Sequence, residues 1–183
     1  YEVGLKTDVG RRVSIDVAAY HLDWNNIQVL GTTGIFSFND NGGGARVNGL
    51  EGTVTIRPVQ GLRTSFNAAL IDAELTDDTP LLVGGMDGDT LPLSFGLNAD
   101  YEWKVSSFAT AFVGGSLRYS GKQRDAFQPG GAPQRRIPDY ATLDLRAGAE
   151  FGQFTLEAYA RNVTNSRGIT NLGDALPLPG GAI

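Results

Sequence analysis

The chain has no cysteine, one histidine and one methionine among its 183 residues. The absence of cysteine excludes a disulfide-stabilised scaffold and thiolate metal sites, and a single histidine excludes a multi-histidine metal centre. Charged residues make up only 19% of the chain, so a highly charged disordered tail is excluded as well. The net charge of −5 argues against nucleic acid as a partner, because binding to phosphates needs an excess of Lys and Arg.

The sequence also lacks the run of about 20 apolar residues that a transmembrane helix requires. It does not have the composition of a coiled coil, which is rich in Ala, Glu, Lys, Leu and Arg. What it has is 25 glycines, 41% hydrophobic residues and an alternation of apolar and polar positions. A β-strand turns successive side chains to opposite faces, so this alternation predicts strands with one apolar and one polar face.

The clearest alternation runs from residue 91 to residue 104, where apolar residues exchange with polar or small ones at every step. Its apolar members are Leu91, Leu93, Phe95, Leu97, Ala99, Tyr101 and Trp103. The pattern recurs at residues 1–6, 13–24, 50–57, 62–70, 108–119, 141–151 and 154–161. Within 13–24 the alternation changes phase, which we interpret as a β-bulge near Ala18 and Ala19.

The connections between these segments alternate in length. Short connections are expected at 8–10, 59–61, 105–106 and 152–153, and long ones at 30–44, 76–90, 121–138 and from 164 onward. Outer-membrane β-barrels combine short periplasmic turns with long external loops, and crossing the lipid takes about 9–11 residues per strand. The pattern therefore predicts about eight antiparallel up-and-down strands of a transmembrane β-barrel, long enough to project beyond the lipid.

Aromatic residues support the same interpretation. Tyr101, Trp103, Phe151 and Phe154 all flank short connections, as in the aromatic girdle at a membrane interface. The apolar positions also include many Ala and Gly, which suits contact with lipid better than the tightly filled core between two sheets.

Six stretches together resemble TonB-dependent outer-membrane receptors. They are residues 1–7 (YEVGLKT, similar to a Y-E-x-G-x-K strand), 19–29, 45–52 (similar to a G-x-E strand), 88–98 (similar to a strand that starts with Leu-Pro), and 137–146 with 159–165 (similar to the last strands before barrel closure). The resemblance covers nearly the whole chain, and the order and spacing of the motifs carry it.

The resemblance implies that residues 1–183 are part of a barrel domain of about 22 strands, with the plug, the early strands and the last strand outside this chain. The expected fold class is all-β, a curved and open antiparallel sheet with two edge strands. The expected location is the outer membrane of a Gram-negative bacterium. The expected partners are lipid, lipopolysaccharide, the plug, TonB and a small-molecule cargo.

The resemblance further implies active uptake of a scarce substrate, with a ferric siderophore as the favoured cargo. No cofactor and no nucleic-acid partner are expected. No enzymatic activity is expected either, because no nucleophile and base are arranged around the single histidine. Two alternatives stay open: a smaller outer-membrane barrel, such as a porin or an adhesin, and a soluble β-sandwich binding module.

Two groups of residues are candidates for the functional site. The first lies on the polar strand faces, which would line the lumen, the plug contact or the cargo route; its arginines could instead simply pair with neighbouring carboxylates. This group is Glu51, Arg57, Arg63, Asn67, Asp144, Arg146, Glu157 and Arg161. The second is a basic loop that could meet lipopolysaccharide phosphates or an anionic chelate, or be an ordinary polar loop. This group is Lys122, Arg124, Arg135 and Arg136.

Overall fold

A computed structural model describes residues 1–32, 37–41, 43–76, 93–124 and 136–170. Within these ranges the chain is all-β, in agreement with the expected fold class. No helix in the described part of the chain is long and apolar enough to cross a membrane.

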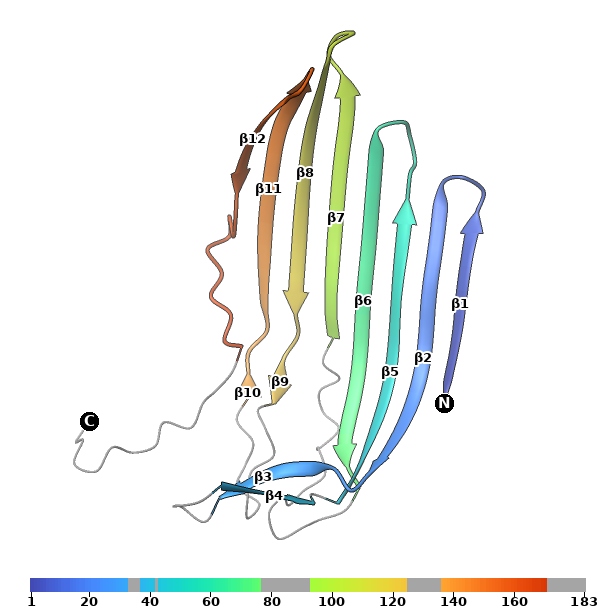
Figure 1. Ribbon diagram of the computed structural model, residues 1–183, viewed down its shortest axis with the longest axis vertical. Coiled ribbons are helices and arrows are strands. Elements are labelled where there is room, and N and C mark those ends of the chain that lie inside the picture. The colour runs from blue at the N-terminus through green and yellow to red at the C-terminus, as the bar shows by residue number, and fades with distance from the viewer. Residues whose placement is uncertain (33–36, 42, 77–92, 125–135, 171–183) are drawn as a thin grey trace, which may run out of the picture.

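Eight strands form a single antiparallel sheet in the order β1-β2-β5-β6-β7-β8-β11-β12 (Figure 1). They are β1 (Glu2–Val9), β2 (Val13–Asn25), β5 (Gly44–Ile56), β6 (Leu62–Leu75), β7 (Leu93–Lys104), β8 (Ala109–Ser120), β11 (Tyr140–Phe151) and β12 (Phe154–Ala160). Neighbours in the sheet follow one another along the chain, which confirms the up-and-down topology. The sheet does not close, so β1 and β12 are its edges.

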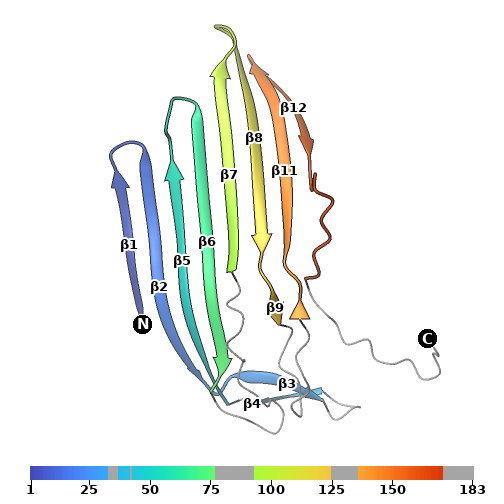
Figure 2. The same ribbon diagram turned by 180° about the vertical axis from the view of Figure 1, so that it is seen from behind.

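The four tight turns lie at one end of the sheet and the longer connections at the other (Figures 1 and 2). Two of these longer connections contain short strand pairs where the sequence analysis expected only loops. They are β3 (Gln28–Thr32) with β4 (Ser37–Asn41), and β9 (Gln123–Arg124) with β10 (Arg136–Ile137). Such pairs satisfy backbone groups that a bare loop would leave to water. The β3–β4 pair extends across the loop end of the sheet toward β9 and β10.

The register confirms that one face of the sheet is apolar. Residues paired across strands point to the same side, so each cross-strand row belongs to one face. One row is Thr7, Ile15, Val54, Phe66, Leu97, Leu117 and Leu143. The next row, on the opposite face, is Asp8, Ser14, Thr55, Ser65, Asn98, Ser116 and Asp144.

The apolar face has no protein layer over it. Phe66 is 44% exposed and Leu97 is 43% exposed. Only Ile27, Leu75 and Ile137 are buried hydrophobic residues in the described part of the chain. An exposed apolar surface that runs across a whole sheet marks an interface with lipid or with protein.

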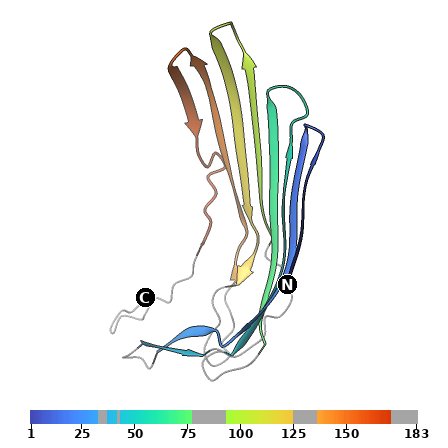
Figure 3. The ribbon, with the colours of Figure 1, turned by 45° about the vertical axis from the view of Figure 1, so that its right-hand side comes forward.

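The polar face is the concave one. The sheet curves along its width, as the oblique view in Figure 3 shows. Four hollows open on the polar face, over strands β2 to β12. The apolar side chains therefore lie on the convex face.

The bulge expected near Ala18 and Ala19 is absent, and that interpretation is wrong. β2 pairs with β1 and with β5 without interruption through both residues. The alternation changes phase because the two faces exchange character toward the loop end of the sheet, not because the pleat shifts.

On the convex side, a polar band follows the apolar rows at the loop end. It consists of His21, Asp23, Arg46, Asn48, Asp72 and Glu74. The Nδ1 atom of His21 lies 2.7 Å from Asn48 Oδ1, and Arg46 lies between Asp23 and Glu74 at 3.5 and 3.4 Å. On the concave side, the same strands present Tyr20, Leu22, Trp24, Val47, Ile71 and Leu75. The apolar part of the convex face, which we call the apolar belt, therefore ends at this polar band, at the loop end of the sheet.

Aromatic rings gather at the turn end of the convex face. The rings of Tyr101 and Trp103 stack with their centroids 5.4 Å apart. Phe151 and Phe154 are cross-strand partners on either side of the last tight turn. The belt is thus bounded by aromatic rings at one end and by the polar band at the other.

Two tight turns allow a test of the hairpin geometry: Gly10 lies in the turn between β1 and β2, and Gly61 lies in the turn between β5 and β6. Gly10 and Gly61 both have left-handed φ angles, of 63° and 83°. A Cβ atom at Gly10 would meet open space, whereas one at Gly61 would overlap the carbonyl oxygen of Glu102. Gly10→Ala should therefore cost about 1 kcal/mol, and Gly61→Ala about 1–3 kcal/mol more. Denaturant titration of both variants measures the difference, and equal losses would contradict the turn geometry.

Candidate functional site

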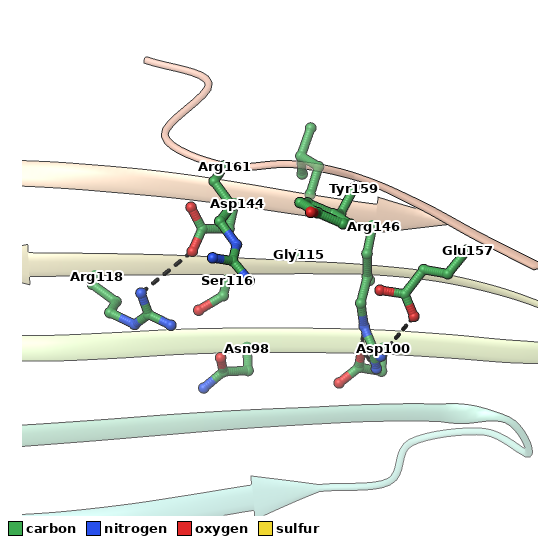
Figure 4. A pocket seen from close by; sticks show the side chains of 12 residues that line it. Asn98, Asp100, Gly115, Ser116, Arg118, Asp144, Arg146, Glu157, Tyr159 and Arg161 are labelled. Atoms are coloured by element: carbon green, nitrogen blue, oxygen red, sulfur yellow. Dashed lines mark hydrogen bonds and ion pairs between the residues drawn. The ribbon is translucent and has the colours of Figure 1, made fainter. Parts of the chain in front are cut away.

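The concave polar face is the candidate site, and one of its hollows lies over β7, β8, β11 and β12 (Figure 4). The hollow has a volume of about 610 Å³. Charged side chains of both signs line it: Asp100, Arg118, Asp144, Arg146, Glu157 and Arg161. These strands place them together because each occupies a polar phase of the alternation.

Arg146 is the centre of the first charge network. Its Nη2 and Nε atoms donate to Asp100 Oδ1, at 2.7 and 3.2 Å. Its Nη1 lies 3.9 Å from Glu157 Oε2, and its guanidinium lies 5.4 Å from the centre of the Phe112 ring. One side chain thereby links β7, β11 and β12.

Gly114 makes this network possible. The register places Gly114 of β8 between Asp100 and Arg146. A Cβ atom there would overlap the Asp100 carboxylate and lie 2.9 Å from Arg146 Nε. The bare backbone of β8 thus lets Arg146 reach across a whole strand. Arg63, the direct register partner of Asp100, makes no ion pair with it in the described structure.

Asp144 is the centre of the second network. One of its oxygens lies 3.3 Å from Arg118 Nη1, and the other accepts the backbone N–H of Asn162 at 2.8 Å. Asn162 has a φ of 48° and holds the turn that follows β12. Its side chain exchanges two hydrogen bonds with the backbone of Ser166, both at 2.9 Å. Asp144 of β11 thus anchors the segment that follows β12.

The residues predicted on the polar strand faces all lie on the concave face. The structure joins Arg146 to Glu157, but it pairs Asp144 with Arg118, which the sequence analysis did not single out. Arg161 lies over the ring of Tyr159, at 5.2 Å. Asn67 lies across Gly96, and Glu51 lines a separate hollow over β2, β5 and β6.

The sequence analysis assigned no role in the site to Asp100, Gly114 or Asn162. Asp100 occupies a polar phase of the clearest alternation, so its face was predictable. Its partner was not, because Arg146 lies 46 positions further along the chain. Only the cross-strand register brings the two together.

The basic loop residues lie at the loop end of the sheet. Arg124 of β9 and Arg136 of β10 are direct cross-strand partners, and Lys122 precedes β9. Arg135 lies outside the described residues, as does Leu91, expected near the start of β7. Within the described ranges, no group of three or more His, Asp or Glu side chains is arranged to hold a metal ion.

A curved sheet with an apolar convex face, a charged concave face, tight turns at one end and long connections at the other is a piece of a β-barrel wall. A family model described as "TonB dependent receptor-like, beta-barrel" matches residues 1–163. The chain belongs to this family, which is a family of outer-membrane transporters of Gram-negative bacteria rather than of enzymes. No curated protein matches the chain.

A double-mutant cycle tests the path of the Arg146 network. Asp100→Asn and Arg146→Gln should show a coupling free energy of about 0.5–1 kcal/mol, as for other partly exposed ion pairs. Asp100→Asn and Arg63→Gln should show a coupling close to zero. Gly114→Val should remove the first coupling, because the new side chain occupies the path. A larger coupling of Asp100 to Arg63 than to Arg146 would contradict the geometry.

Proposed function

We propose that this chain forms part of the wall of an outer-membrane TonB-dependent active transporter. Its convex face contacts lipid, and its concave face lines the lumen, holds the plug and borders the cargo route. The observation that carries the proposal is the apolar belt that crosses the convex face from strand to strand, opposite a concave face rich in paired charges. Lipid solvates the first face, and a plugged, wet lumen solvates the second.

The two open edges support a larger barrel. A sheet in lipid must close, because unpaired backbone N–H and C=O groups find no water there. The edges β1 and β12 therefore pair with further strands. We propose that residues 1–183 belong to a single barrel domain whose plug, early strands and last strand lie outside this chain.

At the loop end of the sheet, polar side chains lie on the convex face and apolar side chains on the concave face. This arrangement supports an external mouth of the barrel that projects beyond the lipid. The polar band on the convex side lies at the level of the polar lipid headgroups. On the concave side at the same height, Leu22 and Trp24 are 49% and 56% exposed, which gives the mouth an apolar inner surface. The long connections surround this mouth and are suited to capturing cargo.

A ferric siderophore is the cargo that we favour. Arg124 and Arg136 lie side by side at the loop end, and two adjacent guanidinium groups suit the oxygen atoms of an anionic chelate. The test is uptake of radioactive iron by cells that express the complete protein, supplied with a panel of ferric siderophores. Uptake that stops when TonB is deleted is expected. Uptake that persists without TonB would favour a porin.

A pair of adjacent substitutions tests which face meets lipid. Leu97→Arg should destabilise the inserted barrel by about 2–4 kcal/mol, because the charge enters the apolar belt. Asn98→Arg, one residue further on, should cost far less, because that side chain points to the concave face. Urea titration of the barrel refolded into lipid vesicles measures both. Equal losses at the two positions would overturn the lipid-facing assignment.

A further inference from the structure

Three arginines occupy one cross-strand row on the concave face near the tight turns. The backbone N–H of Arg57 donates to the carbonyl of Arg12 at 2.7 Å, so these two residues are neighbours across β2 and β5. Arg57 and Arg63 lie opposite each other, one position beyond the last register pair of β5 and β6, which is Ile56 with Thr64. Arg63 pairs with Asp100 of β7. We call Arg12, Arg57 and Arg63 the arginine row. Together with Gln60 and Glu102 it lines a hollow of about 510 Å³.

The arginine row lacks a matching set of counter-charges. None of its three guanidinium groups makes a hydrogen bond or an ion pair with another residue in the described part of the chain. The carboxylate nearest in register, Asp100, is held by Arg146 across Gly114. Asp100 and Arg146 line the hollow as well, so it holds four cations and two carboxylates, and Glu102 is the only one of these two carboxylates that Arg146 does not hold by a hydrogen bond.

Like charges placed side by side on a sheet repel one another. The row is the more unusual because the chain as a whole carries a net charge of −5. Elsewhere on the same face, Lys6, Arg118 and Arg146 each have a carboxylate within 3.3 Å. The counter-charge of the arginine row is therefore expected to come from outside the described strands.

We propose that the arginine row binds an acidic polypeptide segment that lies inside the barrel at the turn end. This inference rests on the proposed function, since it needs the concave face to be the lumen wall. The row crosses three strands and spans about 10 Å, because neighbouring strands lie about 4.8 Å apart. Two carboxylates two residues apart on an extended segment point to the same side and lie about 7 Å apart, which is within the span of the row.

The surroundings of the row favour a polypeptide over a compact anion. The Gln60 amide can both donate to and accept from a peptide backbone. Glu102 can accept backbone N–H groups, which a polypeptide supplies and a phosphate group does not. Lipid headgroups are on the other side of the wall, since the row lies on the concave face. Exposed ion pairs are individually weak and screened by salt, so such a contact holds the segment reversibly.

Accessibility of a single cysteine at position 60 tests this proposal. Gln60 lines the hollow without belonging to the row, and the described chain contributes no cysteine of its own. Gln60→Cys is introduced into the complete protein, freed of any other cysteine, in outer-membrane vesicles. Cationic and anionic methanethiosulfonate reagents are then applied at 0.1 M and 1 M NaCl, and mass spectrometry follows the modification.

The expected result is slow labelling by both reagents at low salt. Labelling should become about tenfold faster in 1 M NaCl, where two or three exposed charge pairs are screened. Arg12→Gln, Arg57→Gln and Arg63→Gln combined should give the fast rate already at low salt. The matched control removes three other positive charges from the same face, with Lys6→Gln, Arg118→Gln and Arg161→Gln, and should keep the slow rate. If the triple variant does not insert into the outer membrane, the comparison of labelling rates at 0.1 M and 1 M NaCl still tests the proposal.

Two outcomes would overturn the inference. Fast labelling at low salt, faster with the anionic reagent, would mean that the row is open to water. Protection that appears only when citrate is added would mean a small-anion site instead of a polypeptide contact. Failure of the proposed function is recognised separately, with Leu97→Cys and Asn98→Cys. If Leu97→Cys reacts as readily as Asn98→Cys in the vesicles, the convex face is not covered by lipid.

Discussion

The uninterrupted backbone ladder from β1 to β12 is the constraint on which the other features depend. It fixes which residues share a row and therefore which face each side chain occupies. The apolar convex face, the charge networks and the arginine row are all consequences of this register. A ladder of this kind tolerates no free edge in lipid, so under the proposed function the edges β1 and β12 need further strands as partners.

Much of this fold could be predicted from the sequence because the side-chain period of a strand is local. The faces of β7 follow directly from the positions of Leu97 and Asn98 in the alternation. The charge pairs could not be predicted in the same way. Asp100 meets Arg146 instead of its register partner Arg63 only because an intervening strand has a glycine at position 114. That choice depends on three strands at once.

The wrong interpretation at Ala18 and Ala19 has a physical lesson. A change of phase in an alternating sequence has two causes, an extra residue in the strand or a change in what surrounds the strand. In β2 the pairing is regular, so no residue is inserted, and what changes along the strand is which face carries the apolar side chains. At the level of Tyr20 and His21, the convex face stops being apolar and the concave face becomes apolar.

The turn at Asn162 bears on how the last strands keep their alignment. A strand that slips by one residue against its neighbour carries every side chain to the other face. In β12, seven residues long, such a slip would move Leu156 from the convex face to the concave face and Glu157 in the reverse direction. The bond from the Asn162 backbone to Asp144 and that from Val163 to the Leu143 carbonyl fix the end of β12 against β11. This turn therefore fixes the register of a short strand at the exposed edge of the sheet.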